Sequence, residues 1–271
     1  MLPGASHVPY ADCYHCPFGQ TPDACDLECI DFIEEFPFKR TMPPDDVAAI
    51  IVEPIQGEGG YIIPPARWFQ RLRDLCDRHG ILLIADEVQS GVGRTGRMFA
   101  MEHFGVRPDI VTVAKGIASG MPLGMCIARA DVMDWPPGAH ASTFGGNPVS
   151  CAAAAATLSL VEGGLMENAR RQGERLLAGL AGLASRHPLI GDVRGLGLMI
   201  GVELVTDRAT RARATGETTR LVLECFQRGL LILACGENAV RLSPPLMIDP
   251  SQADAALGIL DASLTAVEKA G

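Results

Sequence analysis

The chain has 271 residues, with 23 Lys and Arg against 32 Asp and Glu, so its formal net charge at pH 7 is −9. This acidic balance, without any run of Lys or Arg, argues against binding to nucleic acid or to an anionic membrane surface. Hydrophobic residues at 48% and charged residues at 20% exclude disorder as the main state and fit one large α/β unit, or a large and a small one.

Residues 1–46 hold most of the irregular sequence, because prolines recur through them and only residues 23–36 have a helical pattern. We therefore expect an irregular lead-in segment rather than the start of a compact domain. Nothing here predicts a signal peptide, and the most apolar helical pattern, residues 151–161, is short for a membrane span. The expected location is the cytoplasm, with no membrane partner.

Four cysteines of the lead-in segment, Cys13, Cys16, Cys25 and Cys29, form a C-x-x-C pair followed by a C-x-x-x-C pair. Such spacing is compatible with a zinc site. Reduced thiols on a surface segment are the alternative, and we favour them because only the spacing argues for a metal. The remaining cysteines lie among apolar residues, where free thiols pack as small hydrophobes.

From residue 47 apolar runs alternate with amphipathic segments, a pattern typical of parallel strands covered by helices on both faces. This alternating pattern predicts that residues 47–187 form a portion of a large domain, which ends in a connecting helix. The expected strands are residues 47–52, 81–85, 110–114 and 123–128, and the expected helices are residues 66–79, 147–161 and 164–185.

After residue 187 the pattern becomes α+β, and we expect residues 188–271 to form a small C-terminal domain. Its expected strands lie within residues 193–205, 230–234 and 240–242, and its expected helices at residues 217–228 and 250–267.

Polar residues follow three of the expected strands at the point where each strand ends. Glu53 follows the first strand, Asp86 and the residues up to Gln89 follow the second, and Lys115 follows the third. In open α/β sheets reacting groups gather at the carboxyl ends of the strands, so these residues are candidates for a site. The alternative is that the acids cap helices and that Lys115 points to water.

Four segments closely resemble the class III aminotransferases, which are pyridoxal-phosphate (PLP) enzymes of fold type I. These segments are VEPIQGEGG (52–60), IADEVQSGVGRTG (84–96), PDIVTVAKGIASGMPLG (108–124) and STFGGNP (142–148). The chain is most similar to the 4-aminobutyrate aminotransferases and related amino-acid racemases, from about Val8 to the C-terminus. The resemblance implies part of a fold type I large domain, a mostly parallel sheet flanked by helices, followed by a C-terminal α+β small domain.

The resemblance also implies roles for four residues of the strand ends. Lys115 would bond covalently to the aldehyde of PLP, for which a primary amine is required, and then move a proton. Asp86 would hold the pyridine nitrogen protonated, so that the ring accepts electrons from the substrate carbon. Val88 would pack on the ring, where a plain buried strand residue is equally compatible, and Gln89 would hydrogen-bond the ring hydroxyl.

Two further pairs of residues match the family. Ser142 and Thr143 resemble the pair that reaches the partner's cofactor phosphate in a homodimer, although a helix cap would explain the same residues. Arg241 matches the arginine that receives the substrate α-carboxylate, and Glu58 matches the acid that neutralises it when a substrate lacks that group. The competing explanation is that Arg241 and Glu58 form separate surface pairs.

The expected activity is the transfer of an amino group to a 2-oxo acid, such as 2-oxoglutarate. The donor would be 4-aminobutyrate or a related ω- or α-amino acid. Racemisation with the same residues stays open. Family members begin well upstream of residue 1, with a Ser-Gly-rich loop that holds the phosphate, so we expect a C-terminal portion of the full chain. Impaired activity, or a non-catalytic fragment, is therefore a third alternative.

Overall fold

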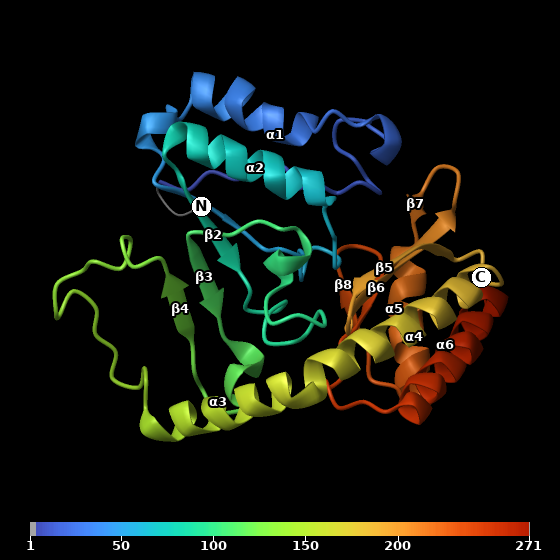
Figure 1. The fold of residues 1–271 in the computed structure, drawn as a ribbon. Helices are drawn as coiled ribbons and strands as arrows, with labels where there is room; N and C mark the ends of the chain where they lie inside the picture. Colours follow the sequence, from blue (N-terminus) through green and yellow to red (C-terminus); the bar gives the residue numbers. More distant parts are fainter. Residues whose placement is uncertain (1–3, 271) are drawn as a thin grey trace.

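The computed structural model describes residues 4–270 and contains two sheets, each with its own helices (Figure 1). The first sheet has the strand order β1-β2-β3-β4. Strands β1, β2 and β3 run parallel, and β4 closes the edge antiparallel to β3. Their bounds are Ala49–Val52 (β1), Leu82–Asp86 (β2), Ile110–Val113 (β3) and Met125–Ala128 (β4).

One face of this sheet packs against helix α2 (Ala66–His79). The helix buries Trp68, Phe69 and Leu72, which share one core with Leu83 and Ala85 of β2. It ends at Gly80, whose φ of 66° is left-handed and favours glycine. The start and end of this helix match the expected bounds, because its apolar residues recur at helical spacing and a glycine follows them.

The lead-in segment is packed, contrary to the expectation of an irregular segment outside the domain. It contains the short turn η1 (Pro22–Ala24), helix α1 (Glu28–Ile33), the π-helical turn η2 (Glu34–Phe38) and η3 (Pro44–Asp46). Ala11, Ile30 and Ile33 are buried in the same core as α2. The expected 23–36 helix is thus divided, and apolar burial rather than regular structure holds this segment in place.

Two helices that meet at a kink join the two halves of the molecule. Helix α3 (Pro148–Leu160) passes through a π-helical turn (Val161–Leu165) into α4 (Met166–Ala184), with Gly164 at φ 145° in the turn. The sequence predicted two helices, and the structure has two, which are separated at Gly164 by a backbone conformation that most residues avoid. Figure 1 shows α3 along the carboxyl edge of the first sheet and α4 against the second.

Taken together, α3, the turn and α4 are longer than the expected apolar helix, which α3 alone matches. Pro148–Ala184 spans 37 residues, and by length and composition alone it passes for a membrane span. Its second half is nevertheless a core helix of the second unit, because Leu176, Leu180 and Leu183 are buried against that unit.

The second sheet is antiparallel, in the order β5-β6-β9-β8, with β7 paired to β6. It packs against α4, α5 (Thr215–Gln227) and α6 (Pro250–Ala270). Strand β6 is buried along most of its length, with Ile200, Val202 and Leu204 in the core with the helices. The strand bounds are Ile190–Leu196 (β5), Met199–Asp207 (β6), Ala212–Arg213 (β7), Leu233–Cys235 (β8) and Ala239–Leu242 (β9).

The other face of β6 packs against the first unit. Met199 shares a small core with Ile55 and Tyr61, which lie in the loop after β1. The division into residues 1–46, 47–187 and 188–271 remains a prediction, and its ends, residues 1–3 and 271, lie outside the described residues.

Candidate active site

Three of the candidate residues stand together at the carboxyl edge of the first sheet. Because β1, β2 and β3 are parallel neighbours, Glu53, Asp86 and Lys115 emerge from the same edge. They are close enough to interact, since both Asp86 and Lys115 act electrostatically on the Glu53 carboxyl. Burial raises the pKa of Glu53, and the hydrogen bond from the Gly57 N–H partly opposes that shift.

Lys115 has a strained backbone and lines a pocket. It opens the 3-10 turn Lys115–Ala118 (η5) with φ 48°, a left-handed conformation that costs energy in a residue with a side chain. The pocket has a volume of about 550 Å³ and lies between the first sheet's loops, the long helix and the loop after β9. Such a volume is enough for a cofactor-sized ligand.

Asp86 lies beside this pocket rather than in its lining. Its Oδ1 accepts hydrogen bonds from the Val88 N–H (3.0 Å) and the Thr112 hydroxyl (3.3 Å). These bonds fix the carboxylate at the strand end.

Val88 and Gln89 line the pocket wall directly after Asp86. Gln89 Oε1 is buried and has no hydrogen-bond partner among the described residues. An unpaired buried amide oxygen is costly, so this atom marks a place where a polar ligand would restore a bond.

The opposite wall carries the expected pair of Arg241 and Glu58, which form an ion pair. Arg241 is only 14% exposed, whereas the Glu58 side chain is 73% exposed. The hydrogen bond from Arg241 lowers the pKa of Glu58. Arg241 is therefore a mostly buried cation, and Glu58 is its solvent-exposed partner.

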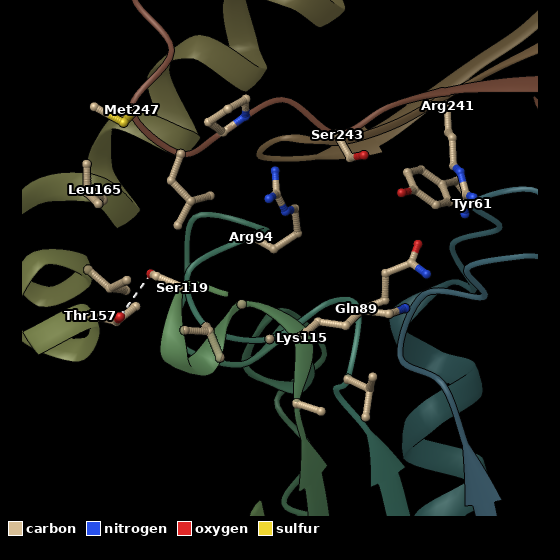
Figure 2. A pocket seen from close by; sticks show the side chains of 18 of the residues that line it. Tyr61, Gln89, Arg94, Lys115, Ser119, Thr157, Leu165, Arg241, Ser243 and Met247 are labelled. Atoms are coloured by element: carbon tan, nitrogen blue, oxygen red, sulfur yellow. Dashed lines mark hydrogen bonds between the residues drawn. The ribbon is translucent and has the colours of Figure 1, made fainter. Parts of the chain in front are cut away.

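Tyr61, Arg94 and Ser243 are among the pocket residues that were not singled out from the sequence. The Arg241 guanidinium lies 5.9 Å from the centre of the Tyr61 ring, within the range of a cation–π contact. Arg94 donates to the carbonyls of Leu198 (3.3 Å) and Pro244 (2.5 Å). Figure 2 shows Arg94 between Lys115 and Ser243. Only the position of Arg94 in the motif GVGRTG gave a signal.

Ser142 and Thr143 are not brought to this pocket. They lie in an exposed loop between β4 and α3, where the Ser142 hydroxyl accepts a hydrogen bond from the Gly145 N–H (2.9 Å). Figure 1 shows this part of the chain extending away from the body of the molecule.

Within residues 4–270 no group of three or more metal-binding side chains is found, so the structure adds no support for the zinc site that the cysteine spacing allows. Burial raises the pKa of the Cys29 thiol to about 11, and it also raises the pKa of Cys13. Packing, rather than coordination, explains Cys29, which lies in the core with α2.

The family model of the class-III aminotransferases matches residues 1–264 of the chain. A 4-aminobutyrate aminotransferase of Escherichia coli, GabT, is 44% identical over 264 residues, which are 96% of this chain and 60% of GabT. A leucine/methionine racemase of Thermococcus litoralis is 43% identical over 270 residues, 99% of this chain and 61% of the racemase. The chain thus spans about 60% of the length of these relatives.

Solved transaminases have the same fold. An aminotransferase from Bacillus anthracis superposes with a TM-score of 0.87 at 33% identity, over 96% of this chain and 61% of the other. An amine transaminase from an uncultivated Pseudomonas species, solved in its PLP-bound form, gives 0.84 at 39% identity, over 93% and 60%. These likenesses confirm the expected fold type I architecture, and the chain belongs to the class-III aminotransferase family.

Proposed function

We propose that this chain provides the PLP-binding and substrate-binding residues of an aminotransferase. In this reaction an amino group passes from an amino acid such as 4-aminobutyrate to a 2-oxo acid such as 2-oxoglutarate. The observation that carries the proposal is the position of Lys115, which lines one pocket together with Gln89 and the Arg241–Glu58 pair. The cytoplasm remains the expected location.

The residues present fit PLP. The Lys115 side chain reaches the pocket, and the unpaired Gln89 Oε1 offers a polar partner for a ring substituent. Asp86 binds its neighbours through Oδ1, so the proposal uses Oδ2 for the protonated ring nitrogen. When bound, PLP supplies a ring that accepts the electron pair released at the substrate carbon.

Lys115 has two roles in this proposal. Its Nζ would hold the cofactor through its aldehyde, and in its free form this amine would take a proton from the amino-bearing carbon of the donor. The constrained turn that begins at Lys115 fixes the origin of the side chain, so that Nζ returns to the same place in each half-reaction.

Arg241 and Glu58 account for two classes of substrate in one site. A substrate with an α-carboxylate would take the two parallel donors of Arg241, and the exposed Glu58 would turn away. An ω-amino acid without that carboxylate would leave Glu58 on Arg241, so that the buried guanidinium stays paired.

The proposed assembly is a homodimer. Ser142 and Thr143 lie on an exposed loop that projects from the body, as expected of residues that serve a neighbouring subunit. In this proposal their hydroxyls hold the phosphate of the partner's cofactor, as the resemblance implies.

Titration of the purified chain with PLP tests the proposal. Wild type should develop visible absorbance, whereas Lys115→Ala should not, and transfer from 4-aminobutyrate to 2-oxoglutarate should fall by about a thousandfold or more. Lys39→Ala is the control, because Lys39 is exposed and pairs only with Glu35. The non-catalytic alternative gains support if no signal depends on Lys115.

Racemisation is the second candidate, because racemases are among the relatives at 39 to 43% identity. It would use the same lysine but return the proton to the opposite face of the carbon. Incubation of one enantiomer with and without a 2-oxo acid separates the two reactions. Amino transfer requires the oxo acid, whereas loss of optical purity does not.

A further inference from the structure

Two arginines lie on one rung of the second sheet. Arg194 of β5 pairs with Gly201 of β6, and Gly201 pairs in turn with Arg241 of β9. A Cβ added at Gly201 would meet the Cβ of Tyr61 at 3.0 Å and the Gly60 carbonyl at 3.1 Å. The missing side chain between the two arginines therefore provides the space in which the loop after β1 is seated.

Both arginines bind this loop, but at different atoms. Arg241 pairs with the side chain of Glu58. Arg194 instead donates to the backbone carbonyls of Gly60 (2.7 and 3.2 Å) and Tyr61 (3.1 Å). We call the Glu58–Arg241 pair the gate, because it would distinguish the two classes of substrate. Arg241 contacts the side chain of Glu58, and Arg194 contacts the backbone of the same loop.

Arg194 is itself held firmly. Its side chain is 14% exposed, and its guanidinium bonds to Asp192 and Glu203 at 2.7 Å each. Glu203 is 5% exposed and is held in turn by His15 (2.5 Å) and Asn238 (3.2 Å). The planar guanidinium reaches two carboxylates and two carbonyls at once, which an ammonium group does not reproduce.

We propose that Arg194 is a positioning residue for the Glu58–Arg241 gate, an inference that rests on the proposed function. It fixes the backbone of residues 60–61. When the Glu58 side chain leaves Arg241 and returns, its main chain therefore stays in place and the same ion pair forms again. Without that anchor Glu58 samples other positions, and Arg241 is left unpaired when a substrate lacks an α-carboxylate.

Arg194→Lys is the test variant, because it keeps a positive charge beside Asp192 and Glu203. Hydrogen exchange within residues 57–61 should accelerate by about tenfold, since the amides of Gly57, Gly60 and Tyr61 bond within the loop that Arg194 anchors. The ratio of kcat/KM for 4-aminobutyrate to kcat/KM for glutamate should fall by about fivefold.

A double-mutant cycle with Glu58→Gln separates positioning from general damage. If Arg194 acts through Glu58, the double variant shows the same ratio as Glu58→Gln alone. Arg73→Lys is the matched control, because Arg73 is similarly buried, 17% exposed, and also pairs with two carboxylates, Asp77 and Asp109. It should leave both the exchange at residues 57–61 and the ratio unchanged.

Unchanged exchange in Arg194→Lys, or additive effects of the two substitutions on the ratio, would overturn the inference. If the wild-type chain transfers no amino group from either donor, the proposed function fails. The exchange comparison then decides the role of Arg194 alone, with acceleration in Arg194→Lys but not in Arg73→Lys supporting it and no difference refuting it.

Discussion

Glu58 and Arg241 form an ion pair across 183 residues of sequence and join a loop of the first unit to a strand of the second. The backbone supports this pairing, because the Gly236 N–H donates to the Glu58 carbonyl at 2.7 Å. The Glu58 side chain is thus exposed, while a backbone hydrogen bond holds its main chain. A pair of this kind suits a site that has to present two different charges to its substrates.

Glu58→Gln should change donor preference rather than folding. Without the carboxylate Arg241 stays unpaired, so KM for 4-aminobutyrate should rise by about fivefold, while KM for glutamate should stay the same or fall. Steady-state kinetics with both donors measures the effect. Glu35→Gln is the control, since Glu35 is exposed and pairs only with Lys39. Equal changes for both donors would contradict the gate.

Gly173→Ala should destabilise the protein although alanine favours helices. A Cβ at Gly173 in α4 would collide with the backbone of Gly197 in the β5–β6 turn. The expected loss is about 2 kcal/mol in the free energy of unfolding, because the obstacle is backbone that does not yield easily. Gly182 lies in the same helix with nothing within 4 Å of an added Cβ, so Gly182→Ala should instead stabilise by up to about 1 kcal/mol. Urea titration of both variants makes the comparison.

His187 should make stability depend on pH. Burial would lower its pKa, but hydrogen bonds to Asp261 (2.7 Å) and Glu268 (2.8 Å) outweigh burial and raise it above the ordinary value of 6.5. The folded state therefore binds the proton more tightly than the unfolded state. This stabilisation is complete below the unfolded-state pKa and is lost as pH rises through the folded-state pKa.

His187→Gln should accordingly cost about 1 to 2 kcal/mol near pH 5.5 and clearly less near pH 9. Asp261 stays charged at the lower pH, because its pKa is lowered by His187. Chemical denaturation at the two pH values measures the difference. His140→Gln, on an exposed loop, should show no such trend. A deficit that grows with pH would show that His187 is neutral in the fold.

Mixed dimers test whether Ser142 and Thr143 serve the neighbouring subunit. One subunit would carry Lys115→Ala, and the other Ser142→Ala with Thr143→Ala. Neither parent should be active, but each mixed dimer would contain one complete site, so an equal mixture should recover about a quarter of wild-type activity. Recovery would fail if both residues acted within their own subunit. Light scattering of each parent checks that the dimer survives.

The sequence pattern predicted those helices whose ends are set by nearby residues, such as a proline at the start or a glycine at the end. Helix α2 starts after Pro65 and ends before Gly80, as its apolar spacing and terminal glycine indicate. The break at Gly164 was predicted as well, because a glycine pair usually ends a helix, and the backbone there is non-helical. The burial of Ile30 was missed, since a short apolar helix in a proline-rich segment gives no sign of the surface that covers it.

For the site, parallel strands made part of the arrangement predictable. Lys115, Val88 and Gln89 follow neighbouring strands and meet in one pocket, with Asp86 beside it. The place of Arg241 in the site was predicted from the family resemblance alone. No sequence pattern near Arg241 indicates that β9 lies next to the first sheet. Tyr61 and Arg194 were not predicted as site residues. Their role depends on the contact between the loop after β1 and Gly201, which are far apart in the sequence.

The amino-terminal segment touches both halves of the molecule. Ile30 is embedded beside α2, while His15 bonds to Glu203 of β6 and Arg211 bonds to the Tyr14 carbonyl. The segment therefore acts as a tether across the two sheets. The arrangement of the two sheets around the pocket therefore depends in part on contacts of residues, such as His15, that do not line it.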